Sequence, residues 1–156
     1  MTLTAPQSDD LIAHTQILLQ SYRQLLGRDL IARSGDASEE ARRLFAAPFV
    51  VLSHDTQADP ILNYGNQTAL DLWEVTPEQL LALPSRLTAE PTNRDARERF
   101  LEETKRKGFV TGYRGVRIST TGRRFEIENA TIWNLSDAAG QPLGQAATFA
   151  SWTRIG

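Results

Sequence analysis

The last third of the chain narrows the possible folds most, because it reads as three β-strands in succession joined by short turns. The strand patterns cover residues 109–119, 123–135 and 143–153. The connections at 120–122 and 137–140 both end in glycine and have the length that joins neighbouring antiparallel strands. This region therefore predicts a three-stranded antiparallel meander.

Two shorter strands are expected earlier, at residues 49–52 and 61–64, separated by a polar loop that ends in a strand-breaking proline. Asn66 follows the second strand and is a natural N-cap for a short helix with an apolar side. Thr76 and Gln79 then have the spacing of a capping box. Together with the meander, these strands predict a sheet of about five.

The N-terminal region is expected to be helical. Ser8 can cap a helix that reaches Leu26 and ends at Gly27, with apolar residues along one broad stripe. That stripe fits a helix on its own domain and equally a helix that pairs with a second copy of the chain. A second helix is expected after Ser38 and must end before Pro48.

One further helix is expected from Asn93 to Lys107, closed by a glycine. It is highly charged and ends in three successive basic residues. Cations at a helix C-terminus have a structural reason to be there, because they interact favourably with the negative end of the helix dipole. The basic cluster is therefore read as structural rather than as a phosphate site.

Length and composition exclude several classes of protein. A chain of 156 residues, 40% hydrophobic and 23% charged, is that of one globular domain. Its longest apolar run, 45–52, is far below the roughly 20 residues of a membrane-spanning helix. The N-terminus lacks the features of a secretory signal, so a cytoplasmic location is expected. A net charge of −2 with mixed signs argues against nucleic-acid binding.

The order of these elements, two strands, short helices, a longer helix and a meander, is that of a PAS-type α+β fold with an additional N-terminal helix. More narrowly, the chain resembles the MEKHLA domain family, PAS-related modules found as stand-alone bacterial proteins and at the C-terminus of some plant homeodomain transcription factors. The resemblance extends over residues 11–152 and rests on LSHDTQADPILNYGNQTALDLWE, LPSRLTAEP, YRGVRISTTGRRFEIENATIWNL and GQAATFASW. It implies a sensory or interaction module, with residues 1–47 as a helical extension and 48–156 as the PAS-like part of one compact domain.

No catalytic or metal-binding constellation is evident. The histidines are His14 and His54, and a metal site needs three or four converging ligands. Ser53, His54 and Asp55 are adjacent, but neighbours along a strand point to opposite faces and cannot form a triad. PAS relatives that bond covalently to flavin or a chromophore do so through cysteine, which this chain lacks. Covalent photochemistry is therefore excluded, whereas noncovalent flavin or haem binding remains open.

The strand at 123–135 suggests where a ligand could lie. Every second side chain from Phe125 to Leu135 is apolar except Asn129 and Thr131, and the opposite parity is mostly polar. A period of two predicts that the apolar parity faces the core. Asn129 and Thr131 would then be buried polar groups that need a partner in the protein, in water or in a ligand.

Arg114 in the preceding strand shares its parity with apolar neighbours, although Gly112 and Gly115 could introduce a bulge that resets it. An inward Arg114 would need an anion, either a carboxylate of the protein or an anionic ligand. The candidate ligand-binding residues are Tyr64, Asn66, Trp73, Phe100, Tyr113, Arg114, Asn129, Thr131 and Trp133.

The favoured function is thus a regulatory module that binds a small, partly apolar ligand or a protein partner, forms a homodimer and catalyses no reaction. One alternative is a cone-shaped α+β enzyme of the nuclear-transport-factor-like type, with an acid/base pocket near Asn129. Such an enzyme needs an inward carboxylate or histidine, and the parity places Glu126 and Glu128 outside. The other alternative is a protein-interaction module with a packed, ligand-free core.

Overall fold

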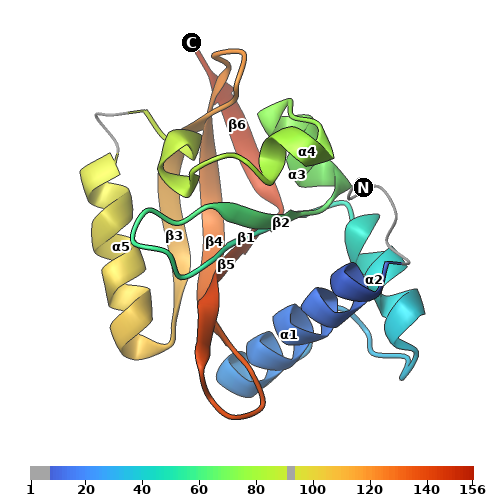
Figure 1. Ribbon diagram of the computed structural model, residues 1–156. Coiled ribbons are helices and arrows are strands. Elements are labelled where there is room, and N and C mark those ends of the chain that lie inside the picture. The colour runs from blue at the N-terminus through green and yellow to red at the C-terminus, as the bar shows by residue number, and fades with distance from the viewer. Residues whose placement is uncertain (1–7, 91–93) are drawn as a thin grey trace.

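The computed structural model describes residues 8–90 and 94–156 (Figure 1). The helices are α1 (Asp9–Leu26), α2 (Ala37–Phe45), α3 (Gln67–Trp73), α4 (Pro77–Leu80), the 3-10 turn η1 (Ser85–Thr88) and α5 (Arg94–Lys107). The strands are β1 (Val50–His54), β2 (Leu62–Gly65), β3 (Phe109–Ile118), β4 (Arg124–Ser136), β5 (Pro142–Phe149) and β6 (Ser151–Ile155). The start expected for the last helix, Asn93, lies outside the described residues.

All strands belong to one antiparallel sheet with the order β2-β1-β5-β4-β3. β6 pairs with the first half of β4, while β5 pairs with its second half. β5 and β6, interrupted at Ala150, are therefore the third strand of the predicted meander. The prediction of an α+β, PAS-like antiparallel sheet is confirmed.

Helices cover both faces of the sheet. Figure 1 shows α5 standing beside β3, α3 and α4 at the upper right, and α1 crossing the lower part of the sheet. We call the side under α3, α4 and α5 the inner face, and the side under α1 and α2 the outer face. Two separate clusters of buried apolar residues correspond to these faces.

The outer cluster is built by α1 on its own sheet. Ser8 caps this helix and Gly27 ends it with φ 74°, as the sequence predicted. Leu18 and Leu19 are buried against strand residues of the same cluster, and Tyr22 meets Trp133 edge to face with ring centroids 5.0 Å apart. The apolar stripe of α1 is thus used within the domain.

A buried carboxylate joins α2 to its surroundings in the outer layer. Glu40 is 1% exposed and accepts hydrogen bonds from Arg33 at 3.0 Å, Gln16 at 2.8 Å and the backbone N–H of Ser34 at 2.8 Å. The bond from Arg33, followed by the others, lowers the pKa of Glu40 to about 2. α2 begins two residues earlier than predicted, because Asp36 rather than Ser38 caps it by accepting from the N–H of Glu39.

β3 and β4 pair through two β-bulges, one in each strand. In β4, Ile127 lies opposite Gly115 and Ala130 lies opposite Tyr113, so two residues of β4 face one of β3. Asn129 lies in this stretch with φ 52°, a left-handed conformation that asparagine tolerates better than most residues. The bulge changes parity, so that Ile127 and Ala130 both join the inner cluster.

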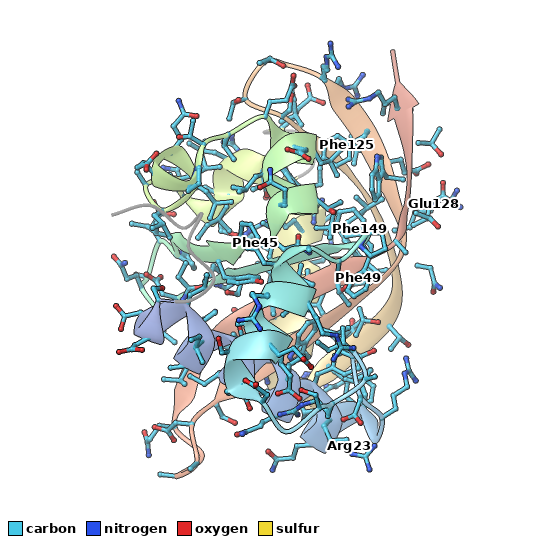
Figure 2. All side chains as sticks on the ribbon, turned by 90° about the vertical axis from the view of Figure 1, so that its right-hand side faces the viewer. Arg23, Phe45, Phe49, Phe125, Glu128 and Phe149 are labelled. Atoms are coloured by element: carbon cyan, nitrogen blue, oxygen red, sulfur yellow. The ribbon has the colours of Figure 1, made fainter. Side chains whose placement is uncertain are left out.

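The bulge in β3 is centred on Gly112, as the sequence suggested. Val110 lies opposite Ile132 and Tyr113 lies opposite Ala130, which leaves an extra residue in β3, and Gly112 has φ 70°. Beyond this bulge Tyr113 is in the inner cluster. The outward position of Glu128 in β4 is visible in Figure 2.

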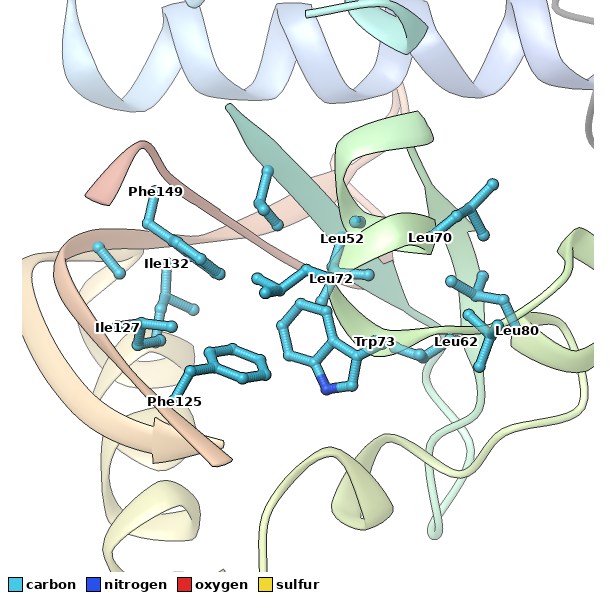
Figure 3. Packing of buried hydrophobic residues seen from close by; sticks show 14 of the residues in the cluster. Leu52, Leu62, Leu70, Leu72, Trp73, Leu80, Phe125, Ile127, Ile132 and Phe149 are labelled. Atoms are coloured by element: carbon cyan, nitrogen blue, oxygen red, sulfur yellow. The ribbon is translucent and has the colours of Figure 1, made fainter. Parts of the chain in front are cut away.

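The inner cluster is centred on Trp73. Its ring meets Phe125 at 5.1 Å and Phe149 at 6.2 Å between centroids, both edge to face, and Figure 3 shows it among leucines of α3 and β1. Asn66 caps α3 and Thr76 caps α4 with a full capping box, so both predicted caps are confirmed. These caps hold α3 and α4 over the inner face, where the candidate site lies.

Candidate functional site

A cavity of about 60 Å³ lies within the inner face. Its wall is mostly apolar and includes Leu52, Leu62, Trp73, Leu101, Ile127, Ala130, Ile132, Ala147 and Phe149. Its polar lining residues are Ser53, His54, Ser85, Thr88, Arg97, Tyr113, Arg117 and Gln145. Strands β1 to β5, α3, η1 and α5 therefore all contribute to one small cavity.

Arg97 enters the cavity from α5. Its residue is 4% exposed, although most side chains of this helix point to solvent. One guanidinium nitrogen donates to Ser85 Oγ at 2.5 Å, and another donates to Glu98 at 2.8 Å. Because the Glu98 side chain is 59% exposed, this ion pair leaves part of the Arg97 charge uncompensated inside the protein.

Arg117 enters the same cavity from β3 and is 8% exposed. It donates to the Tyr113 hydroxyl oxygen at 2.9 Å and to the Val116 carbonyl at 2.9 Å, and it lies 5.3 Å from the centroid of the Tyr113 ring. Within residues 8–90 and 94–156, no carboxylate forms an ion pair with Arg117. Burial, and then the nearby Arg117 charge, lower the pKa of Arg97.

His54, at the end of β1, lines the cavity and carries a buried hydrogen-bond acceptor. Its Nδ1 lies 2.9 Å from the Asp55 carbonyl oxygen, which can only accept, so Nδ1 carries the proton and Nε2 is the bare nitrogen. Nε2 is buried and has no hydrogen-bond partner among the described residues. Burial is the main cause that lowers the pKa of His54, which keeps the ring neutral.

Two other polar side chains complete the wall. The indole Nε1 of Trp73 is buried without a partner in the described part of the chain. Gln145 in β5 donates to the Leu101 carbonyl of α5 at 3.0 Å and to Asn134 Oδ1 at 3.1 Å. Gln145 thus ties the middle of α5 to the sheet next to the cavity.

An open groove of about 810 Å³ runs along the outside of this wall, between the β1–β2 loop, α5 and the β4–β5 turn. The cavity and the groove share His54, Arg97, Leu101 and Gln145. These four residues therefore line both spaces.

Three of the predicted site residues are at or beside the cavity. Trp73 and Tyr113 line it. Phe100 packs behind Tyr113, with ring centroids 4.3 Å apart, and is not among the lining residues.

The other predicted residues are elsewhere, and the prediction that they share one inward face is wrong. Tyr64 and Trp133 belong to the outer cluster, and Thr131 has the same strand parity as Trp133. The Asn66 side chain is engaged in the cap of α3 and in bonds to Val51 N, Leu44 O and Phe49 O. These bonds use its donors and its acceptor within the protein.

Asn129 and Arg114 are exposed rather than inward. Arg114 forms an ion pair with Glu126 of β4 at 3.4 Å, with 64% of its side chain exposed. The physical reason is the pair of bulges, which move the inward parity from Asn129 to Ala130 and place Arg117 at the cavity instead of Arg114. The cavity therefore exists, but Asn129 and Thr131 do not border it.

Sequence reasoning missed His54, Ser85, Arg97, Arg117 and Gln145 as cavity residues. Arg97 was missed because α5 is so highly charged that its sequence does not distinguish a buried arginine from the exposed ones. For Arg117 a signal was available: if the bulge at Gly112 is counted, Tyr113 and Arg117 share the inward parity.

The cavity does not fit a large cofactor. At about 10–15 Å³ per water-sized position, a cavity of about 60 Å³ has room for about four to six non-hydrogen atoms. A flavin or a haem has several times as many atoms, so neither fits in this cavity. For metals, residues 8–90 and 94–156 contain no group of three His, Asp or Glu side chains placed to hold an ion.

The sheet order and the helices over its inner face define a PAS-type fold, and solved structures agree. The fold is similar to a PAS domain from Colwellia psychrerythraea, with a TM-score of 0.62 and 16% identity over 75% of this chain and 94% of that one. It is also similar to a light-oxygen-voltage domain studied with a flavin analogue (TM-score 0.59, 16% identity, covering 76% of this chain and 85% of that one). A PAS domain from a two-component sensor histidine kinase matches with a TM-score of 0.55 and 18% identity over 73% of this chain and 91% of that one.

Within this fold class, the family model of the MEKHLA domain matches residues 12–154. The chain belongs to the MEKHLA domain family. The resemblance noted in the sequence is thus confirmed, and the cone-shaped enzyme fold considered as an alternative is not the fold of this protein.

Relatives with curated descriptions are plant proteins. The homeobox-leucine zipper protein ATHB-9 of Arabidopsis thaliana is 24% identical over 99% of this chain and 19% of its own length. The homeobox-leucine zipper protein HOX29 of rice is 28% identical over 79% of this chain and 15% of its own length. The chain thus spans less than a fifth of these relatives, and the expectation of a bacterial source gains no support from them.

One finding bears on location. Among the described residues, no helix has both the length and the apolar character that crossing a membrane requires.

Proposed function

We propose that this MEKHLA domain is a regulatory module that binds a small molecule in its core cavity and passes the bound state to a partner. The observation that carries the proposal is the cavity itself, a space of about 60 Å³ whose lining residues His54 and Trp73 each have a buried polar atom that lacks a partner within the described residues. Such atoms cost free energy unless something hydrogen-bonds to them. A few ordered waters or one small ligand would do so.

α5 is the element best placed to report occupancy. Its apolar contacts with the inner cluster come from Phe100 and Leu101, which are only partly buried. Polar bonds add to this attachment near the cavity, from Gln145 to Leu101 and from Asn134 Nδ2 to the Lys105 carbonyl at 3.3 Å. A ligand that contacts Arg97 would change the free energy of docking α5, and α5 faces solvent on its other side.

The proposed role is binding rather than catalysis, in a cytoplasmic protein that forms a homodimer. Among the described residues no carboxylate lines the cavity, so a general base would have to be the neutral His54. Since α1 is engaged with its own sheet, the dimer would use the part of the outer face over β3, the first half of β4 and β6. Sedimentation that shows a monomer at high protein concentration would contradict the dimer.

Ligand binding can be tested without knowing the ligand. Compounds of up to about six non-hydrogen atoms, a number set by about 10–15 Å³ per water-sized position, would be screened by thermal unfolding on wild type and on Ala130→Val. Ala130 is fully buried and lines the cavity, so the added methyl groups should fill it. We expect at least one compound to raise the Tm of wild type and not that of Ala130→Val.

The same screen has a contradicting outcome. If no compound raises the Tm, or if both proteins respond equally, the cavity is not a binding site. The domain is then better explained as a ligand-free interaction module.

A further inference from the structure

Two buried guanidinium groups face the cavity from different elements, Arg97 from α5 and Arg117 from β3. A buried charge without a close counter-ion is unfavourable, and two like charges near one another add repulsion. The protein offers Arg97 only the exposed Glu98, and within the described residues Arg117 pairs with neutral oxygens of Tyr113 and Val116. The cavity therefore has an excess of positive charge.

The remaining wall limits the chemistry of a counter-ion. The residues around the guanidinium groups are largely aliphatic and aromatic, which suits a short hydrocarbon tail better than a hydrated inorganic ion. The Trp73 Nε1–H, buried and without a partner in residues 8–90 and 94–156, supplies a further donor to an oxygen. A planar carboxylate accepts from two guanidinium groups at once with favourable geometry.

We propose that the cavity binds a short-chain monocarboxylate of two or three carbons, with its carboxylate between Arg97 and Arg117 and its carbon chain on the apolar wall. The size follows from about four to six water-sized positions in the cavity volume. This inference rests on the proposed function, because it assigns a ligand class to the same cavity.

Because Arg97 belongs to α5, binding of such a ligand should change how strongly α5 is attached to the sheet. The carboxylate would bridge a side chain of α5 and a side chain of the sheet, which adds an attachment that the unliganded domain lacks. Bound ligand should therefore slow amide hydrogen exchange in α5, beside the Gln145 bond to Leu101.

The probes are acetate, propionate and pyruvate, compared with sodium chloride and sodium phosphate at equal ionic strength and pH. Their neutral counterparts, acetamide and propionamide, have nearly the same shape. We expect one or more of the carboxylates to raise the Tm by about 5–10 °C at a hundredfold excess over Kd. Chloride, phosphate and the amides should produce a much smaller shift.

The decisive variant is Arg117→Met, with Arg114→Met as matched control. Both residues are arginines of β3, three positions apart, but Arg114 is exposed and paired with Glu126. Arg117→Met should weaken carboxylate binding at least about thirtyfold, the effect of removing one partner of a buried, hydrogen-bonded charge pair. Arg114→Met should bind within about twofold of wild type, because an exposed ion pair contributes little.

Arg117→Lys guards against a folding failure, since it keeps the charge and loses the fork of donors. If it folds and binds more weakly than wild type but more tightly than Arg117→Met, the proposal stands. Equal binding by wild type and a folded Arg117→Met would overturn it.

The amides and Ala130→Val separate this inference from the proposed function. Amides that bind wild type as well as carboxylates do, and fail to bind Ala130→Val, would leave the cavity as a ligand site and refute the carboxylate. Chloride or phosphate that stabilises as strongly as the carboxylates would refute it too. If none of the probes binds, the carboxylate proposal fails, and the broader screen alone decides the proposed function.

Discussion

Two buried charges, Glu40 in the outer layer and Arg117 at the inner face, differ in the partners that surround them. Glu40 is matched by Arg33, Gln16 and two backbone N–H groups, so its charge is neutralised and its oxygens are bonded. Arg117 is buried to a similar degree but has neutral partners within the described residues. The completed network around Glu40 needs nothing more, whereas the incomplete one around Arg117 marks the side of the molecule where a ligand can contribute.

The same contrast holds for packing. The outer cluster joins α1 directly to the sheet, with Leu18 fully buried. The inner cluster surrounds a cavity of about 60 Å³. Substitutions that test packing should therefore have opposite results on the two faces.

The largest effect is expected for Leu18→Ala in α1. It leaves a void in a filled cluster, and we expect the free energy of unfolding to fall by about 3–5 kcal/mol. Urea unfolding measures this loss. The control is Ile17→Ala, at a half-buried position of the same helix, which should lose less than half as much. Equal losses would mean that α1 is held loosely and that the two faces do not differ in packing.

The second effect is pH dependence from the two histidines. Burial lowers the pKa of His14, which lies in the outer layer 2.9 Å from Ser53 Oγ, to about 4, and it also lowers the pKa of His54. Between pH 6.5 and 4 the unfolded chain binds protons that the folded chain does not, so acidification favours unfolding. Stability should fall by about 3 kcal/mol for His14 across this window.

His14→Gln and His54→Gln separate the two faces in this experiment. Each should flatten the dependence of unfolding free energy on pH above 4.5. The contribution of Glu40 is lost mainly below that pH, because its pKa falls from the ordinary value of 4.5 to about 2 on folding. A carboxylate bound in the cavity should reduce the contribution of His54 to this pH dependence, because a nearby negative charge favours the protonated ring. The contribution of His14 should stay unchanged. Slopes that neither variant alters would contradict burial as the cause.

The smallest effect is expected from adding methyl groups to alanine on each face. Ala130→Val fills part of the cavity and should leave stability unchanged or raise it by about 0.5–1 kcal/mol. Ala41→Val, at a position of α2 that is 1% exposed, should cost about 1–3 kcal/mol through overpacking. Thermal and urea unfolding of both variants measure the difference, and a loss in Ala130→Val as large as in Ala41→Val would show that the cavity closes in solution.

Much of the fold followed from the sequence because its signals are local. The cap at Ser8, the capping box at Thr76 and the turns of the meander depend on residues a few positions apart. The cap of α2 was misplaced since Asp36 and Ser38 both have suitable side chains, and the choice between them depends on where the helix docks.

The site was less predictable because it depends on register between strands. A period of two is reliable only along an uninterrupted strand, and β4 is interrupted at Asn129. Whether Arg97 is buried depends on how α5 packs on the sheet, and the highly charged sequence of this helix does not indicate that. Trp73 was identified as part of the cavity wall because it is the last residue of a short helix whose N-cap is clear in the sequence.

The bulge at Asn129 also sets a length constraint on the gene. Since β4 changes faces there, Ile132 contributes to the cavity while Trp133 contributes to the packing of α1. Loss of one codon in this stretch would exchange the two roles, sending the indole of Trp133 toward the cavity and Ile132 toward α1. The number of residues between Ile127 and Trp133 should therefore be kept among relatives more strictly than the identity of any one of them.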